Sequence, residues 1–374
     1  MEKDLTKGPI LKTLLLFALP MMLGNLLQQI YNITDTIIVG RVLGSGALAA
    51  VGSTYTLMTF LTSVMIGLCM GCGTLFSMHY GAGHQEKMKE CMWVSFWLIC
   101  AVTLVMYLIV FTGTDGILNL LRTPTDIYRL MRTYSRIIFL GIGFTFLYNY
   151  FAFVLRAVGN SVLPLIFLAI SSLLNIALDL WFVIGLHFGV GGAAGATVIA
   201  QAVSGVCCLI FMIKRFELLR MTKEEAKPDR DILLALCNMG VPMGLQYSIT
   251  AIGSVVLQTA VNGLGSMAVA AVTAGTKISM FFCCPFDALG STMATYGGQN
   301  IGARKLDRIS RGLKAASVMG CVYAVFALGV LFVFGRQISL LFLDRGQTEI
   351  LGQVQMFLIG NSLFYIPLAF VNIV

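Results

Sequence analysis

The chain has 374 residues, of which 58% are hydrophobic and only 11% are charged, and its mean hydropathy is +0.88. Water-soluble domains usually carry about 25% charged residues, so this composition excludes a soluble globular protein and predicts an integral membrane protein. The formal net charge of +8 does not indicate a nucleic-acid partner, because the basic residues lie mainly in the connections between apolar segments, where they set membrane orientation.

Ten apolar segments are long enough to cross a bilayer as helices, which takes roughly 20 residues each. They cover about residues 14–38, 47–78, 92–111, 131–153, 163–186, 192–213, 235–260, 268–298, 315–334 and 350–373. Proline occurs inside several of them, which membrane helices tolerate when neighbouring groups satisfy the freed carbonyl. The segments predict an all-α polytopic membrane protein.

The first segment contains one charged residue, Asp35, in a stretch from Leu14 to Arg41 that is otherwise uncharged. Burying a carboxylate at membrane depth costs several kcal/mol unless it is paired, so we interpret Asp35 as a functional residue. The polar residues of this segment recur at steps of three and four, which places them on one helix face. They are Asn25, Gln28, Gln29, Asn32, Asp35 and Thr36.

The fifth and sixth segments each have a polar face of the same kind, made of Ser171, Asn175 and Asp179 and of Thr197, Gln201 and Ser204. Carboxylate, amide and hydroxyl oxygens at one depth are hard ligands, which suit a proton or a sodium ion rather than a transition metal. For Thr197 alone, an interhelical hydrogen bond is the alternative interpretation. The predicted members of the cation-coupling site are Asp35, Asn175, Asp179 and Thr197.

The distribution of Lys and Arg predicts the orientation in the membrane. With the N-terminus in the cytoplasm, 17 of the 25 basic residues fall on the inner side, as the positive-inside rule requires. The longest polar connection, residues 214–231, is then cytoplasmic. We expect a multi-pass protein of the plasma (inner) membrane that acts as a monomer in the lipid bilayer.

An internal repeat divides the chain at that connection. "LGSGALAAV" at 43–51 parallels "LGSMAVAAV" at 264–272, and "GAGHQEKMKE" at 81–90 parallels "GARKLDRISR" at 302–311. Parallel halves of this kind are typical of transporters, with the site at their interface. We predict an N-lobe (1–213, six spans), an inter-lobe loop (214–234) and a C-lobe (235–374, four spans), and we interpret the chain as a C-terminally incomplete version of a twelve-span protein.

A third carboxylate inside a predicted span, Asp287 in "CCPFDALGS", has no obvious partner on its own helix face. It is a candidate for substrate binding or coupling. No histidine lies in the middle of a segment, and no nucleophile and base are paired within the membrane. We therefore expect no enzymatic activity and no cofactor other than H⁺ or Na⁺ as the coupling ion.

The chain resembles the multidrug and toxic compound extrusion (MATE) family of bacterial transporters. The resemblance rests on "LPMMLGNLLQQIYNITDTIIVG", the paired "LGSGALAAVG" and "LGSMAVAAVT", "GGQNIGA", "RAVGN" and "NIALDLWFVIG". It implies twelve helices in two pseudo-symmetric bundles, and export of cationic or amphipathic compounds in exchange for H⁺ or Na⁺. The family's N-lobe cation site maps to Asp35, Asn175, Asp179 and Thr197, with Asn149 and Tyr134 beside it. Further candidates for substrate binding or coupling are Asp287, Gln28, Asn32 and Gln201.

Two alternative functions stay open. A lipid-linked saccharide flippase of the same superfamily would need several cationic residues in its cleft, and the first six segments contain no central Arg or Lys. A non-transporting, truncated relative is the other alternative, because the second half has fewer predicted spans than the first.

Overall fold

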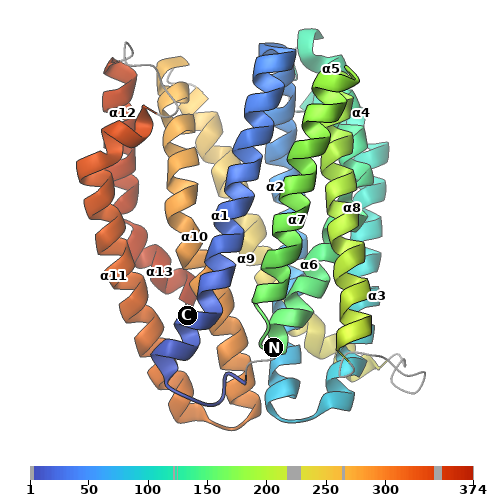
Figure 1. Ribbon diagram of the computed structural model, residues 1–374, viewed down its shortest axis with the longest axis vertical. Helices are drawn as coiled ribbons and strands as arrows, with labels where there is room; N and C mark the ends of the chain where they lie inside the picture. The colour runs from blue at the N-terminus through green and yellow to red at the C-terminus, as the bar shows by residue number, and fades with distance from the viewer. Residues whose placement is uncertain are drawn as a thin grey trace.

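The computed structural model describes residues 4–120, 123, 125–216, 229–262, 266–340 and 348–373, and these residues form helices and turns without strands (Figure 1). The α-helices of the first half are α1 (Ile10–Leu43), α2 (Ser45–Gly81), α3 (Gln85–Thr112), α4 (Thr114–Leu120), α5 (Thr125–Leu140), α6 (Ile142–Ala157), α7 (Val162–Asp179) and α8 (Gly189–Arg215), with a π-helix, η1 (Leu180–Gly185), after α7. The second half contains α9 (Arg230–Asn262), α10 (Ser266–Gly302), α11 (Leu306–Ser339), α12 (Thr348–Ser362) and α13 (Tyr365–Ile373). The predicted inter-lobe loop falls mostly outside the described residues.

Seven helical spans in the described residues are long and apolar enough to cross a membrane, or nine if each of two bent helix pairs is one span. These nine correspond to nine of the ten predicted segments. The remaining segment, 268–298, forms α10, which has 37 residues but is not among them. The arrangement of six plus four spans therefore stays a prediction.

Two of the spans are bent, which the hydropathy pattern did not predict. α5 and α6 meet at 43°, and α12 and α13 meet at 45°. Between α5 and α6 lies Gly141, where an added Cβ would lie 2.7 Å from Cγ2 of Val198 in α8. Because only glycine allows this approach, the bend and the packing of α8 depend on the same residue.

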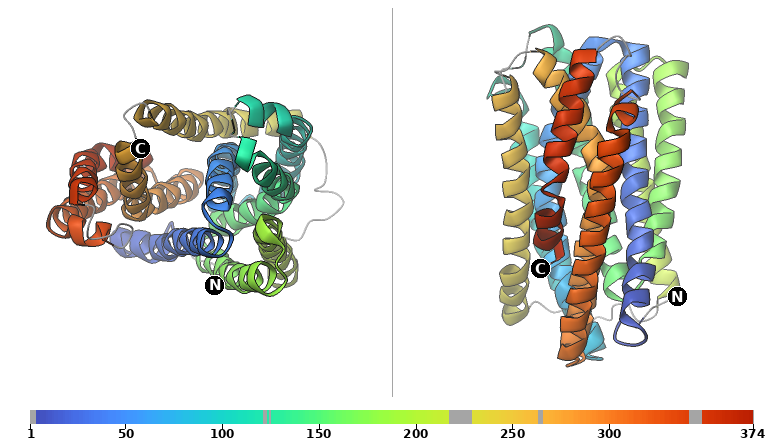
Figure 2. Two further views of the ribbon diagram at one scale, coloured as in Figure 1. Left: turned by 90° about the horizontal axis from the view of Figure 1, so that it is seen from above. Right: turned by 90° about the vertical axis from the view of Figure 1, so that its left-hand side faces the viewer.

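The helices form two groups, which Figure 2 shows from above: the cyan and green helices of the first half and the orange and red helices of the second. The repeat is visible in the helix lengths, since α1 and α2 have 34 and 37 residues while α9 and α10 have 33 and 37. α1 passes between the two groups (Figure 1). Its Leu14, Phe17 and Met21 pack into the core of the second half, while Gly24 contacts Leu165 and Leu168 of α7.

Glycines allow the two halves to touch backbone to backbone. An added Cβ at Gly67 of α2 would lie 2.5 Å from the Cα of Gly244 in α9, and one at Gly71 would lie 2.6 Å from the Cα of Gly240. Larger residues would force α2 and α9 apart, so these glycines bring the cores of the two halves together.

Candidate cation site

Asp35 and Asp179 meet between α1 and α7. Asp179 is the last residue of α7 and is fully buried, and the π-helix η1 follows it directly. Short π-helical turns often occur at functional sites because they change the direction of the flanking side chains. The carboxyl groups of the two aspartates are close enough to interact electrostatically. When both are ionised they are acceptors only, so neither can satisfy the other.

Four oxygen atoms of this site are buried and have no hydrogen-bond partner among the described residues: Oδ1 of Asp35, Oδ1 of Asn175, and Oδ1 and Oδ2 of Asp179. Asn175 is also buried, and its Nδ2 donates to Oγ1 of Thr197 at 3.3 Å. Thr197 in turn donates to the carbonyl oxygen of Ala193 at 3.1 Å. These bonds use the amide nitrogen of Asn175 and leave its carbonyl oxygen free to bind a cation.

Neither aspartate is paired with a basic residue in the part of the chain that the structure describes. The ion pairs there are formed by Asp4 with Lys7 and by Asp115 with Arg132 and Arg136. Buried acceptors without donors are costly and rare. A proton or a small cation would supply the missing partner for several of these oxygens at once.

Two tyrosines lie close to the pair. Tyr134 of α5, which the sequence indicated, and Tyr31 of α1, which it did not, are both within electrostatic range of Asp35 and Asp179. Tyr31 is four residues before Asp35, one turn along the same helix face, and that spacing could have identified it. Tyr134 belongs to a buried apolar cluster that also includes Val39 and Val183.

Other candidates from the sequence form hydrogen bonds of their own or are partly exposed. Nδ2 of Asn149 donates to the carbonyl oxygen of Thr145 at 2.8 Å, and a hydrogen bond joins the Thr145 hydroxyl to Gln201. The bond between Thr145 and Gln201 thus joins α6 to α8. The side chain of Gln28 is exposed and that of Asn32 is half-buried.

Asp287 has a partner that its own helix could not provide. Its Oδ1 lies 3.5 Å from Nδ2 of Asn372 in α13. The side chain is exposed, although its neighbours Phe286 and Ala288 are fully buried. Asp287 is therefore an accessible carboxylate in the middle of a long helix, held by a neutral amide.

A sequence model of the family described as MatE matches residues 20–181 and 242–374. The chain belongs to the MatE family. Its members are membrane transporters, so this chain is a multi-pass membrane transporter and not an enzyme. Its fold class is all-α, with two pseudo-symmetric helical bundles.

Relatives within the family support this assignment. The chain is 30% identical to the "Probable multidrug resistance protein YpnP" of Bacillus subtilis over 99% of its own length and 82% of the relative's. It is 29% identical to the "Probable multidrug resistance protein YoeA" of the same species, over 92% and 76%. It is 25% identical to the "Multidrug export protein MepA" of Staphylococcus aureus, over 92% and 76%.

Solved MATE structures have the same fold. A multidrug resistance MATE transporter of the MOP superfamily, in an outward-facing conformation, superposes with a TM-score of 0.92 at 23% identity, over 99% of this chain and 84% of that one. A MOP superfamily transporter from Pyrococcus furiosus, described as having a binding pocket of reverse polarity, superposes with a TM-score of 0.88 at 22% identity, over 99% and 85%.

Proposed function

We propose that this MATE-family chain is a secondary active antiporter that exports cationic or amphipathic drugs and other toxic compounds in exchange for H⁺ or Na⁺. The names of its relatives support multidrug export. The observation that carries the proposal is the group of four buried, unpartnered oxygens of Asp35, Asn175 and Asp179. We assign the coupling ion to these residues and Thr197.

Charge explains how this site would respond to the ion. Two adjacent carboxylates in a poorly hydrated site repel each other, and the repulsion grows as the local dielectric constant falls. A proton or Na⁺ between them removes that repulsion and draws Asp35 of α1 towards Asp179 of α7. Because α1 also packs on the second half, a change in its contact with α7 would affect the interface between the lobes.

Exchange requires that the ion and the drug favour opposite states of one two-state structure. Entry of the ion from outside would neutralise the aspartates and weaken their attraction for a bound organic cation. The drug would then leave to the outside, and the lobes would rock to open towards the cytoplasm.

We assign Asp287 to the drug rather than to the ion. Its carboxylate is exposed, and Asn372 is its hydrogen-bonding partner in the described structure. An accessible anion without a fixed counter-ion can pair with the charged group of a mobile organic cation. The Asp35–Asp179 pair has three buried carboxylate oxygens and suits a small ion.

The test is efflux of a fluorescent organic cation from proteoliposomes that contain the purified chain, under an imposed pH or sodium gradient. We expect efflux that depends on one gradient, is lost in Asp35→Asn, and is unchanged in Asp231→Asn, a carboxylate at the exposed start of α9. Efflux by Asp35→Asn with unchanged dependence on pH and sodium would contradict the proposal. No efflux by the unaltered chain would favour a non-transporting relative, and movement of a lipid-linked saccharide instead would favour the flippase.

A further inference from the structure

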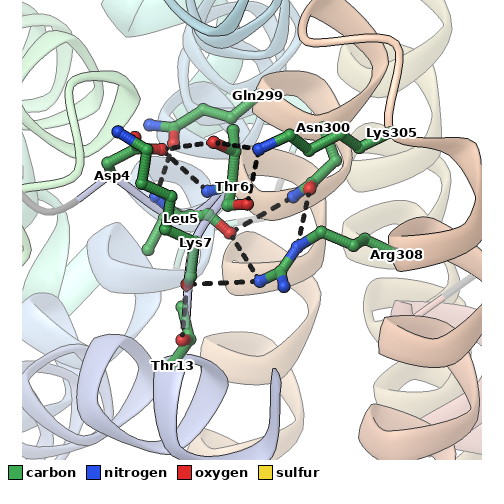
Figure 3. Close-up of polar contacts among 9 residues, drawn as sticks. All are labelled: Asp4, Leu5, Thr6, Lys7, Thr13, Gln299, Asn300, Lys305 and Arg308. Atoms are coloured by element: carbon green, nitrogen blue, oxygen red, sulfur yellow. Dashed lines mark hydrogen bonds and ion pairs between the residues drawn. The ribbon is translucent and has the colours of Figure 1, made fainter. Parts of the chain in front are cut away.

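The segment before α1, residues 4–9, lies at one end of the helix bundle (Figure 1). It bonds to residues of α10 and α11 (Figure 3). We call it the N-terminal strap. It has no regular secondary structure, yet Leu5 is only 1% exposed and belongs to the hydrophobic core of the second half. The candidate cation site does not explain why this segment is buried against the second half.

One side chain, Gln299 of α10, joins the strap to both halves of the protein. Its Oε1 accepts a hydrogen bond from the backbone nitrogen of Leu5 at 3.0 Å. Its Nε2 donates to the carbonyl oxygen of Ala157, the last residue of α6, at 2.8 Å. Both bonds are buried, and Gln299 is fully buried. The amide thus uses one end for the strap and the other for the N-lobe.

Two cations of the second half hold the backbone of the strap. Lys305 donates from Nζ to the carbonyl oxygen of Thr6 at 2.9 Å. The Arg308 guanidinium donates to the carbonyl oxygens of Leu5 and Lys7, both at 3.3 Å, and of Gly8 at 3.0 Å. Bonds from charged donors are stronger than neutral ones. They satisfy carbonyl groups that a segment without helix or sheet cannot satisfy internally.

At the same end of the bundle, the two halves are in backbone contact. An added Cβ at Gly81 of α2 would lie 2.0 Å from the carbonyl oxygen of Gln299, and one at Gly302 of α10 would lie 1.9 Å from that of Met78. The bond from Gln299 to Ala157 requires this contact, because α6 and α10 would separate if the halves opened here.

We propose that the N-terminal strap is a latch that keeps the two lobes closed at this end, and that it is released from Gln299 when the lobes separate there. The consequence for transport rests on the proposed function, since an alternating-access exporter must open this end to load its substrate. The strap continues directly into α1, which contains Asp35. One helix therefore connects the latch to the candidate cation site, which gives a continuous physical route between them.

Hydrogen–deuterium exchange of the full chain in lipid nanodiscs tests the latch without requiring transport. Losing a buried hydrogen bond should speed exchange of the peptide that covers residues 4–9 by about tenfold or more. We expect this in Gln299→Leu, which removes both buried bonds, and a smaller increase in Lys305→Ala, which removes the part-buried bond to Thr6. Lys314→Ala is the matched control, because Lys314 is an exposed lysine of α11 that has no hydrogen bond or ion pair with the described strap. Its exchange should equal that of the unaltered chain.

A second pair of variants tests whether the strap responds to lobe contact. Gly81→Ala places a methyl group against the backbone of Gln299 in α10 and keeps every side chain that bonds the strap. We expect it also to speed exchange of residues 4–9. Gly297→Ala, in α10 where an added Cβ has open space, should not. Faster exchange of the α7 and α8 peptides as well would show that a variant is misfolded. In that case the test of the latch rests on Lys305→Ala, because Lys305 is partly exposed and its loss should not disturb the fold.

Unchanged exchange of the strap in both Gln299→Leu and Lys305→Ala would contradict the proposal that the strap is a latch. Equal effects of Gly81→Ala and Gly297→Ala would contradict the proposal that the strap responds to contact between the lobes. A separate measurement of drug efflux distinguishes failure of the latch proposal from failure of the proposed transport function. If the unaltered chain moves no drug but the exchange pattern is as expected, the latch stands and the proposed function fails.

Discussion

Asn175 donates a hydrogen bond of 3.3 Å from its Nδ2 to Oγ1 of Thr197, which ties α7 to α8 one helical turn before Asp179. The bond uses the donor end of the amide, so the carbonyl end stays without a partner beside two carboxylates. It also gives Thr197 a definite part in the proposed cation site, because the hydroxyl orients a ligand.

The first prediction concerns the two aspartates. Asp35→Asn and Asp179→Asn keep the size of the side chain but remove its charge, so each should fold and insert normally while ion-coupled efflux is abolished. The double variant should be little worse than either single one, because the two groups act as a unit. Efflux at matched expression is the measurement, and additive losses would show that the aspartates work independently.

Thr197→Ala should lower the affinity of the site for the coupling ion without abolishing ion-coupled efflux. Removing a residue that orients a ligand typically costs about 10–100-fold in ion affinity. Thr197→Ser keeps the hydroxyl and should restore most of that affinity. The measurement is the ion concentration, or pH, at half-maximal efflux. Equal values for the Ala and Ser variants would show that the hydroxyl has no orienting role.

Gly141→Ala should destabilise the protein. Its new methyl group would lie 2.7 Å from Cγ2 of Val198, and overpacking of this kind costs about 1–3 kcal/mol. Gly143→Ala, two residues later, meets no atom within 4 Å and should be neutral or slightly stabilising, since alanine favours a helix. Thermal unfolding in detergent compares the two, and equal melting temperatures would contradict the predicted clash.

The Asp115–Arg132 pair gives a prediction about pH. Nε of Arg132 donates to Oδ1 of Asp115 at 2.5 Å and Nη2 donates to Oδ2 at 2.8 Å. These bonds lower the pKa of Asp115 below its ordinary value. The stabilisation by the pair is thus fully present above the unfolded pKa of about 3.9 and disappears as the pH falls through the lower folded value.

The melting-temperature difference between the unaltered chain and Asp115→Asn should therefore stay constant from about pH 8 to pH 5 and shrink only below about pH 4. The effect should be modest and weaker in high salt, because the pair is solvent-accessible. A difference that disappears already near neutral pH would show that the carboxylate is not held ionised by Arg132.

The orientation is tested in intact cells with a membrane-impermeant thiol reagent and mass-spectrometric mapping. Thr222, in the predicted cytoplasmic loop, lies outside the described residues. We expect Thr222→Cys to stay unlabelled from outside and His187→Cys, between η1 and α8, to be labelled. The reverse pattern would show that the N-terminus is outside.

The sequence by itself determined the fold class, the two related halves and which side chains share a helix face. Asn175 and Asp179 had to lie on one face because four residues make about one helical turn, and a carboxylate at membrane depth indicated function because it is costly there. These are local properties of a helix, so the amino-acid sequence alone is enough to infer them.

Only the tertiary structure decided which faces meet. Tyr31 lies within electrostatic range of Asp179, Asn372 lies beside Asp287, and Gln299 joins Leu5 to Ala157. In each case the residues come from segments far apart in the chain. Helical periodicity does not predict these relationships, because they depend on the angles and distances at which helices pack, and these are set by steric fit at residues such as Gly81, Gly141 and Gly302.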